Sequence, residues 1–184
     1  MGRYLIAIFL SIIVTSFDFP EYNSEVGKVN WVTMQEAIDL SKKNPKKIVV
    51  DMYTDWCGWC KKLDRDVYGH PIISAYLNEK FYAVKFNTEK MTSPVTFKGQ
   101  VFNYIPPPKG GRRGIHELAY YLMNEKASYP TTVFIDENLN PIQPIPGYQK
   151  APYFDTIIKF LGENKYKEMS WPDFQNSYKS PVGS

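Results

Sequence analysis

The stretch VVDMYTDWCGWCKKLDRDV, residues 49–67, contains the only two cysteines of the 184-residue chain. A pair spaced like Cys57 and Cys60 is compatible with a zinc site, a structural disulfide or a dithiol/disulfide redox couple. Zinc needs four ligands, and the chain adds only His70 and His116, 10 and 56 residues after Cys60, which is far from finger spacing. A disulfide across so short a loop constrains little unfolded-chain entropy. The redox couple is therefore favoured, and a zinc-stabilised domain stays as an alternative.

The residues around the pair predict the elements that a redox couple needs. Residues 46–54, KKIVVDMYT, form a short β-branched run that is typical of a buried strand. From Cys57 the period becomes helical, with Cys60, Leu63 and Val67 on one side. A thiol at a helix N-terminus is stabilised as the thiolate by unpaired N–H groups. A second thiol one turn later is shielded and can attack a mixed disulfide to release the product.

Asp51 interrupts the apolar strand just before the cysteines. A carboxylate among such neighbours loses hydration, which raises its pKa and suits it to proton transfer. The alternative is a satisfied residue on an edge strand.

The remaining pattern predicts an α/β layered fold with a mixed sheet, in which a parallel crossover joins the first two strands and an antiparallel pair closes the end. Thr33 and Glu36 predict a capping box for the first helix, and His70-Pro71 interrupts the helical pattern that follows the cysteines. The further predicted elements are a helix in 31–45, a strand at 81–87, a hairpin at 95–104 turning at Lys98-Gly99, a turn-rich loop at 105–114, a helix at 115–126, two strands in 131–145, a helix at 151–164 and a short helix at 170–179 packed on the body.

Composition and the N-terminal sequence limit the possible partners and location of the protein. The 43% hydrophobic and 16% aromatic content predicts a sizeable core, and a dispersed net charge of +3 argues against nucleic acid as a partner. Residues 1–16 combine Arg3 with an apolar run at 4–14 that is too short to span a bilayer, which needs about 20 residues. We therefore predict a cleaved signal peptide, no stable membrane insertion, a polar linker at 17–30 and a periplasmic or otherwise exported, oxidising location. The alternatives are that residues 1–16 form an uncleaved membrane anchor or a buried first secondary-structure element.

The segment VVDMYTDWCGWCKK resembles the thioredoxin active-site sequence V-D-F-W-A-x-W-C-G-P-C-K. AVKFNTE is similar to the next thioredoxin strand, SYPTTVFID to the strand that carries the cis-proline, and Gly147 to the glycine before the last helix. The resemblance covers residues 31–162 apart from an insert at 89–114, and it leaves 163–184 as a C-terminal extension with a short helix. It is strongest to exported single-domain proteins with a WCxWC-K motif. It implies a thioredoxin-like fold, a mixed central sheet flanked by helices, with the insert before the cis-proline helix.

The resemblance also implies roles for the site residues. Cys57 would be the exposed nucleophile and Cys60 the resolving thiol. Asp51 would be the buried proton acceptor and Lys85 its charge partner. No metal or other cofactor is expected. An apolar surface for unfolded or extended polypeptide would be formed by Trp56, Trp59, Tyr129, Tyr148 and a cis-proline at Pro130, whose missing N–H leaves neighbouring backbone groups to pair with a substrate.

Three features depart from thioredoxin. Trp59 stands where thioredoxin has proline and strongly oxidising relatives often have histidine; an uncharged ring favours a reductase-like to intermediate potential. The insert is a candidate specificity element, in which Arg112 and Arg113 either meet an acidic partner or only solvate a loop. His116 either reaches the cysteines or a partner, or is a solvated helix histidine.

Two functions of different classes follow. The first is an exported thiol–disulfide oxidoreductase that reduces or reshuffles disulfides in other exported proteins. It would need a thiol reductant relayed across the membrane, because an oxidising compartment supplies none. The second is a thioredoxin-fold binding module or chaperone for secreted polypeptides, whose cysteines trap partners with little turnover.

Overall fold

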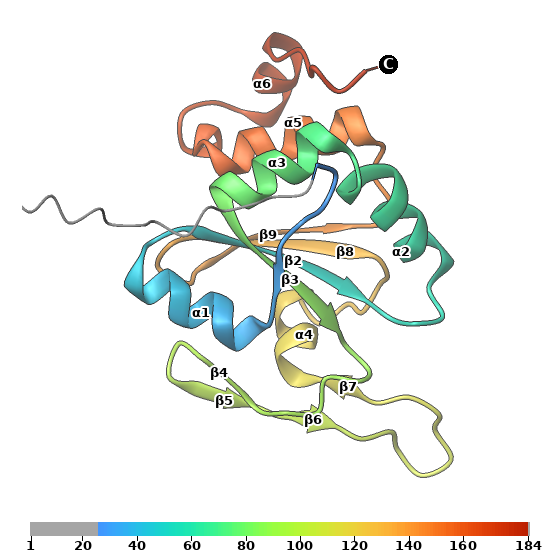
Figure 1. Ribbon diagram of the computed structural model, residues 1–184. Coiled ribbons are helices and arrows are strands. Elements are labelled where there is room, and N and C mark those ends of the chain that lie inside the picture. The colour runs from blue at the N-terminus through green and yellow to red at the C-terminus, as the bar shows by residue number, and fades with distance from the viewer. Residues whose placement is uncertain (1–25, 184) are drawn as a thin grey trace, which may run out of the picture.

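The computed structural model describes residues 26–183, so the predicted signal peptide at 1–16 and most of the linker lie outside the described residues. A five-stranded sheet forms the centre, and β3 pairs in parallel with β1 and β2 while β8 and β9 continue the sheet antiparallel (Figure 1). This confirms the expected mixed α/β architecture. The strands in spatial order are β1 (Trp31–Val32), β3 (Phe81–Asn87), β2 (Lys47–Tyr53), β8 (Thr131–Ile135) and β9 (Pro141–Pro146).

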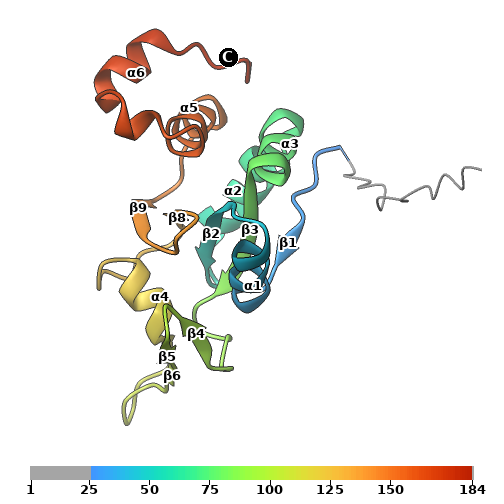
Figure 2. The same cartoon turned by 90° about the vertical axis from the view of Figure 1, so that its left-hand side faces the viewer.

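Helices cover both faces of the sheet and enclose two apolar cores. α2 (Gly58–Leu63), α3 (Pro71–Lys80) and α5 (Ala151–Gly162) lie on one face, and α1 (Met34–Lys43) and α4 (Glu117–Leu122) on the other (Figures 1 and 2). Side chains alternate along β2, so Val49 enters the first core whereas Val50 and Met52 enter the second. Asp51 follows the period of Val49 and therefore points to the face that carries α2.

The boundaries of several helices differ from the predicted ones. The α1 helix starts after Thr33 with the predicted capping box, but residues 31–32 form β1 beside β3. The helix after Cys57 is not continuous, because a π-helical turn, Asp64–Tyr68, follows α2 before His70 caps α3. In 115–126 only Glu117–Leu122 is α-helical.

The insert folds as two small hairpins beside α4. The first, β4 (Val95–Phe97) and β5 (Gln100–Phe102), confirms the predicted hairpin. The second, β6 (Tyr104–Ile105) and β7 (Ile115–His116), was not predicted. Val95, Phe97 and Phe102 are buried in the second core, so the insert is part of the folded body. The loop between β6 and β7 projects at the lower right of Figure 1.

The C-terminal extension packs on α5, as predicted. Phe160 of α5 contacts Trp171 and Phe174 of α6 (Trp171–Ser177). The buried Asp155 accepts hydroxyl hydrogen bonds from Tyr178 at 2.8 Å and Ser180 at 2.7 Å. Within residues 26–183, no helix has both the length and the apolar character needed to cross a membrane.

Candidate active site

Cys57 and Cys60 are joined by a disulfide at the start of α2. The chain leaves β2 at Tyr53, and Cys57 is the N-cap residue whose sulfur accepts a hydrogen bond from the Cys60 amide at 3.0 Å. Only 5% of Cys57 and 2% of Cys60 are accessible. The expectation of an exposed Cys57 is therefore wrong for the disulfide form, because its sulfur is bonded to Cys60 and directed to the first turn of α2 instead of solvent.

Asp51 is buried in the central strand and faces one cation. β2 has neighbours on both sides, which excludes an edge residue, and the register places Lys85 of β3 beside Asp51. The Lys85 Nζ lies 2.8 Å from Asp51 Oδ2, but neither Asp51 oxygen accepts a well-directed hydrogen bond from the described residues. Burial raises the pKa of Asp51 to about 6; Lys85 and the Tyr68 hydroxyl oppose this shift, and Asp64 adds to it.

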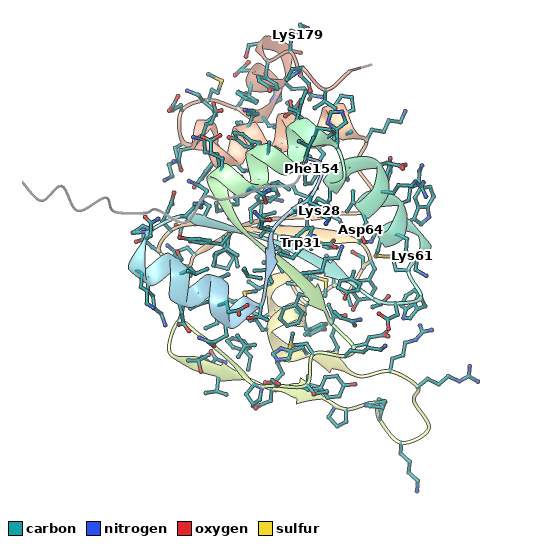
Figure 3. The ribbon with its side chains drawn as sticks, in the orientation of Figure 1. Lys28, Trp31, Lys61, Asp64, Phe154 and Lys179 are labelled. Carbon is teal, nitrogen blue, oxygen red and sulfur yellow. A yellow bond between two sulfur atoms is a disulfide. The ribbon has the colours of Figure 1, made fainter. Side chains whose placement is uncertain are left out.

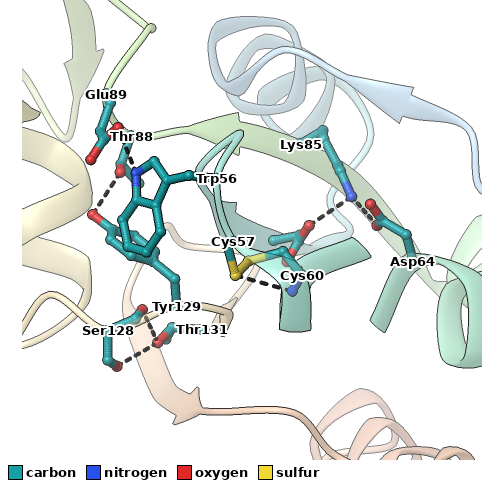
Figure 4. The surroundings of a disulfide bond; sticks show 11 residues. Trp56, Cys57, Cys60, Asp64, Lys85, Thr88, Glu89, Ser128, Tyr129 and Thr131 are labelled. Carbon is teal, nitrogen blue, oxygen red and sulfur yellow. Dashed lines mark hydrogen bonds and ion pairs between the residues drawn. A yellow bond between two sulfur atoms is a disulfide. The ribbon is translucent and has the colours of Figure 1, made fainter. Parts of the chain in front are cut away.

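Lys85 is shared between two carboxylates. Its ammonium pairs with Asp64, as Figure 4 shows, and also with Asp51. The Trp31 ring centroid lies 4.9 Å from the Lys85 Nζ. Burial alone would lower the pKa of Lys85, but the two carboxylates outweigh it and raise that pKa. Lys85 therefore stays charged, and the charge that it offers Asp51 is divided.

Asp64 was not identified from the sequence. It lies one turn after Cys60 and lines a pocket of about 370 Å³ together with Cys60. It also lines a neighbouring pocket of about 340 Å³ with Lys85 and Trp31; Figure 3 labels Trp31 and Asp64 at this part of the molecule. The i, i+4 spacing from Cys60 was the available signal. Asp64 links the buried ion pair to solvent beside the disulfide.

Replacing Asp64 by asparagine is expected to lower the pKa of Asp51, because Lys85 would then pair with Asp51 alone. The pH midpoint for release of a mixed disulfide would shift to lower pH, as measured by stopped-flow fluorescence between pH 4 and 8. The matched variant Asp66→Asn removes a carboxylate that pairs with Lys62 and Arg65, and it should leave the midpoint unchanged. An unchanged midpoint in Asp64→Asn would contradict the sharing of Lys85.

Aromatic residues surround the disulfide. Trp56 and Trp59 are 51% and 59% exposed, and Trp59 contacts Tyr148 with ring centroids 5.5 Å apart. A shallow pocket of about 330 Å³ is lined by Trp59, Tyr129, Pro130, Gly147 and Tyr148. The Tyr129–Pro130 peptide bond is cis. Four of the residues proposed as a polypeptide-binding surface therefore line one shallow pocket. Trp56 does not line it, but its ring packs edge-on against Tyr129 with the ring centroids 5.9 Å apart.

The insert reaches this aromatic surface. The Trp56 indole N–H donates to Glu89 at 2.9 Å, and the Arg113 guanidinium lies 4.2 Å from the Trp56 ring centroid. The Thr88 hydroxyl donates to the Tyr129 hydroxyl at 2.7 Å (Figure 4). Neither contact was predicted, because nothing in local spacing relates residue 56 to residue 89 or residue 88 to residue 129.

The histidines have structural roles. His116 is buried, not solvated; its Nε2 lies 3.1 Å from the Ser93 carbonyl oxygen and its Nδ1 accepts from the Leu118 amide at 3.2 Å. Both expectations for His116 are therefore wrong, because its ring nitrogens are used within the insert and at the start of α4. Burial lowers the pKa of His116. His70 caps α3. In residues 26–183, no three His, Cys, Asp or Glu side chains are grouped as metal ligands.

The sequence matches the profile of the Thioredoxin-like domain over residues 34–162. It is 38% identical to Thioredoxin Y, chloroplastic, from Oryza sativa subsp. japonica over 64 residues, which cover 33% of this chain and 34% of the relative, so the chain spans about a third of that protein. The fold is similar to a thioredoxin from Thermus thermophilus, with a TM-score of 0.52, 18% identity and coverage of 82% and 98% of the two chains. It is also similar to a thioredoxin-fold protein from Helicobacter pylori, with a TM-score of 0.51, 18% identity and coverage of 72% and 79%. The Cys57–Cys60 pair lies within the matched residues, and the chain belongs to the thioredoxin-like domain family.

Proposed function

We propose that the protein is an exported disulfide reductase or isomerase that acts on other exported proteins. The observation that carries the proposal is the Cys57–Cys60 disulfide at the start of α2, with the buried Asp51 on the sheet face that carries α2 and exposed aromatic residues around the pair. Export is supported by the N-terminal sequence, in which a single Arg3 precedes the apolar run at 4–14.

The reaction starts from the dithiol form. The Cys57 thiolate attacks one sulfur of the substrate disulfide; a Cys57–substrate disulfide forms, the substrate S–S bond breaks, and one substrate thiolate leaves. The Cys60 thiolate then attacks the Cys57 sulfur, which forms the Cys57–Cys60 disulfide and releases the second substrate thiolate. The substrate gains two electrons and, with protonation, becomes a dithiol, while the protein is oxidised. A thiol reductant relayed across the membrane would restore the dithiol by the same exchange.

Asp51 serves the second step. The Cys60 thiol must lose its proton before it can attack, and a carboxylate with a pKa of about 6 is ionised at neutral pH yet is a far better proton acceptor than an ordinary aspartate. Lys85 holds Asp51 in place and Asp64 connects the pair to solvent, so the proton can leave.

Trp59 supports the reducing direction. The indole is exposed and contacts Tyr148, and it carries no positive charge that would stabilise the Cys57 thiolate as a histidine does. A less stabilised thiolate makes the disulfide form more favourable, which lowers the reduction potential. We therefore expect a potential in the reductase-like to intermediate range.

The test is multiple-turnover reduction of insulin disulfides by the purified dithiol protein in the presence of excess dithiothreitol. The expected result is many insulin molecules reduced per protein molecule, seen as precipitation of the free B chain well before the dithiothreitol control. Stoichiometric mixed disulfides without turnover would contradict the proposal and favour the binding module.

A further inference from the structure

The insert, residues 89–114, forms one wall of the surface around Cys57. Glu89, at its start, accepts the hydrogen bond from the Trp56 indole, and Arg113, at its end, covers the Trp56 ring. Glu89 and Arg113 also face each other, with 3.7 Å between Oε1 and Nε. Because Trp56 directly precedes Cys57, any polypeptide bound at the disulfide on this side must pass the insert.

The insert carries an unusual concentration of positive charge. It holds one acidic residue, Glu89, and five basic residues, so its net charge is +4, whereas the whole chain has only +3. Glu89 is paired with Arg113 and Lys90 with Asp55. Lys109 and Arg112 are exposed and have no carboxylate within ion-pair distance among residues 26–183. Two cations of this loop are thus available to a partner.

The loop that presents these cations is preorganised. Tyr104 and Ile105 of β6 pair with His116 and Ile115 of β7 at its base, and Pro106, Pro107 and Pro108 lead out of β6. The Gly111 amide donates to the Pro108 carbonyl at 2.7 Å, and a Cβ at Gly114 would collide with the Tyr104 hydroxyl and the Ile105 carbonyl. A loop held in this way loses little conformational entropy when it binds.

We propose that the insert is a docking arm for acidic polypeptide segments, which recognises Asp or Glu residues that flank the target disulfide. The proposal deepens the proposed function and depends on it. Lys109 and Arg112 supply the charge, and the Trp56–Arg113–Glu89 contact fixes the arm beside Cys57. Exposed charges of this kind act mainly on encounter and binding, and each contributes modestly in water. The arm therefore selects among substrates while the chemistry stays with the cysteines.

The test compares three peptides that contain the same intramolecular disulfide, flanked by Asp-Glu, by Gln-Gln or by Lys-Arg. At low salt, kcat/KM of the native protein should be about five- to tenfold higher for the acidic peptide than for the neutral one, with the difference in KM. The preference should disappear in Lys109→Gln/Arg112→Gln and at about 0.5 M salt, where charges are screened within a few ångströms.

The matched control is Lys43→Gln/Lys179→Gln, which removes the same charge from an exposed position in α1 and from one after α6. Figure 3 labels Lys179 near the C-terminus, at the opposite end of the molecule from the β6–β7 loop. The control should keep the preference for the acidic peptide. Equal rates for all three peptides, or a preference that persists in the Lys109/Arg112 variant, would overturn the docking arm and leave the reductase intact. Failure to reduce any of the peptides would instead contradict the proposed function.

Discussion

Replacing Cys57 by serine is expected to reduce insulin turnover to the level of the dithiothreitol background, because a hydroxyl is not ionised at neutral pH and cannot attack a disulfide sulfur. Replacing Cys60 by serine is expected to stop turnover as well, but by a different route. Cys57 can still attack, and the Cys57–substrate disulfide then persists because no resolving thiol is present. The two losses are distinguished by non-reducing electrophoresis, which should reveal mixed disulfides in Cys60→Ser only.

The Cys60→Ser variant, expressed as the full chain, also identifies the partners. Trapped complexes should contain exported proteins with disulfides, together with the donor that reduces the Cys57–Cys60 pair. The double variant Cys57→Ser/Cys60→Ser is the matched control, and complexes found with it as well are not thiol exchange products. Equal trapping by Cys57→Ser would contradict the assignment of Cys57 as the nucleophile, since attack would then start from Cys60.

The fold and the pair of cysteines were predictable because their signals are local. The strand at 46–54, the capping box at Thr33 and the hairpin turning at Lys98-Gly99 each occupy one short window, and the structure contains all three. The Asp51–Lys85 pair was predictable only through the resemblance to thioredoxin, because the two residues meet across neighbouring strands.

The remaining features depend on contacts that no local pattern encodes. The β6–β7 strands have two residues each, too few for an alternating pattern to be recognised. The sequence around His116 is compatible with a solvated helix residue. In the structure His116 is buried, and its Nε2 lies against the Ser93 carbonyl oxygen of the insert. The contact of Trp56 with Glu89 joins residues 33 positions apart, and only the assembled insert brings them together. The spacing of Asp64 from Cys60 places it one turn after the cysteine, but no sequence pattern indicates that Asp64 shares Lys85 with Asp51.

Replacing Asp51 by asparagine is expected to stabilise the disulfide form at pH 7 while it slows the release of mixed disulfides. The folded protein holds Asp51 with a pKa of about 6, against 3.8 for an ordinary aspartate, so the folded state binds more protons than the unfolded state between these values. The contribution of Asp51 to stability is therefore most favourable below pH 4, falls as the pH rises through 6, and levels off above 7. The difference in pKa corresponds to about 3 kcal/mol at pH 7, which is the upper limit of the gain in Asp51→Asn.

Urea unfolding of the disulfide form at pH 4 and pH 7 measures this effect. The gain in stability of Asp51→Asn over the native protein should be larger at pH 7 than at pH 4, because the other carboxylates contribute equally to both proteins. Asp155→Asn is the matched control, because Asp155 is equally buried but accepts hydrogen bonds from Tyr178 and Ser180. It should lower the free energy of unfolding by about 1 kcal/mol, since charge-assisted hydrogen bonds are replaced by neutral ones.

Asp51→Asn is expected to raise the stability but to lower the rate of mixed-disulfide release. This combination distinguishes a catalytic carboxylate from a structural one. Without the carboxylate, release of a mixed disulfide at pH 7 should slow on the order of 100-fold, because Cys60 loses its proton acceptor. The native rate should fall as the pH drops below about 6, where Asp51 becomes protonated, and this inflection should be absent in the variant. A variant that is both less stable and equally fast would show that Asp51 only supports the fold. A gain in stability at the expense of turnover is expected of a charge that the protein keeps buried for its chemistry.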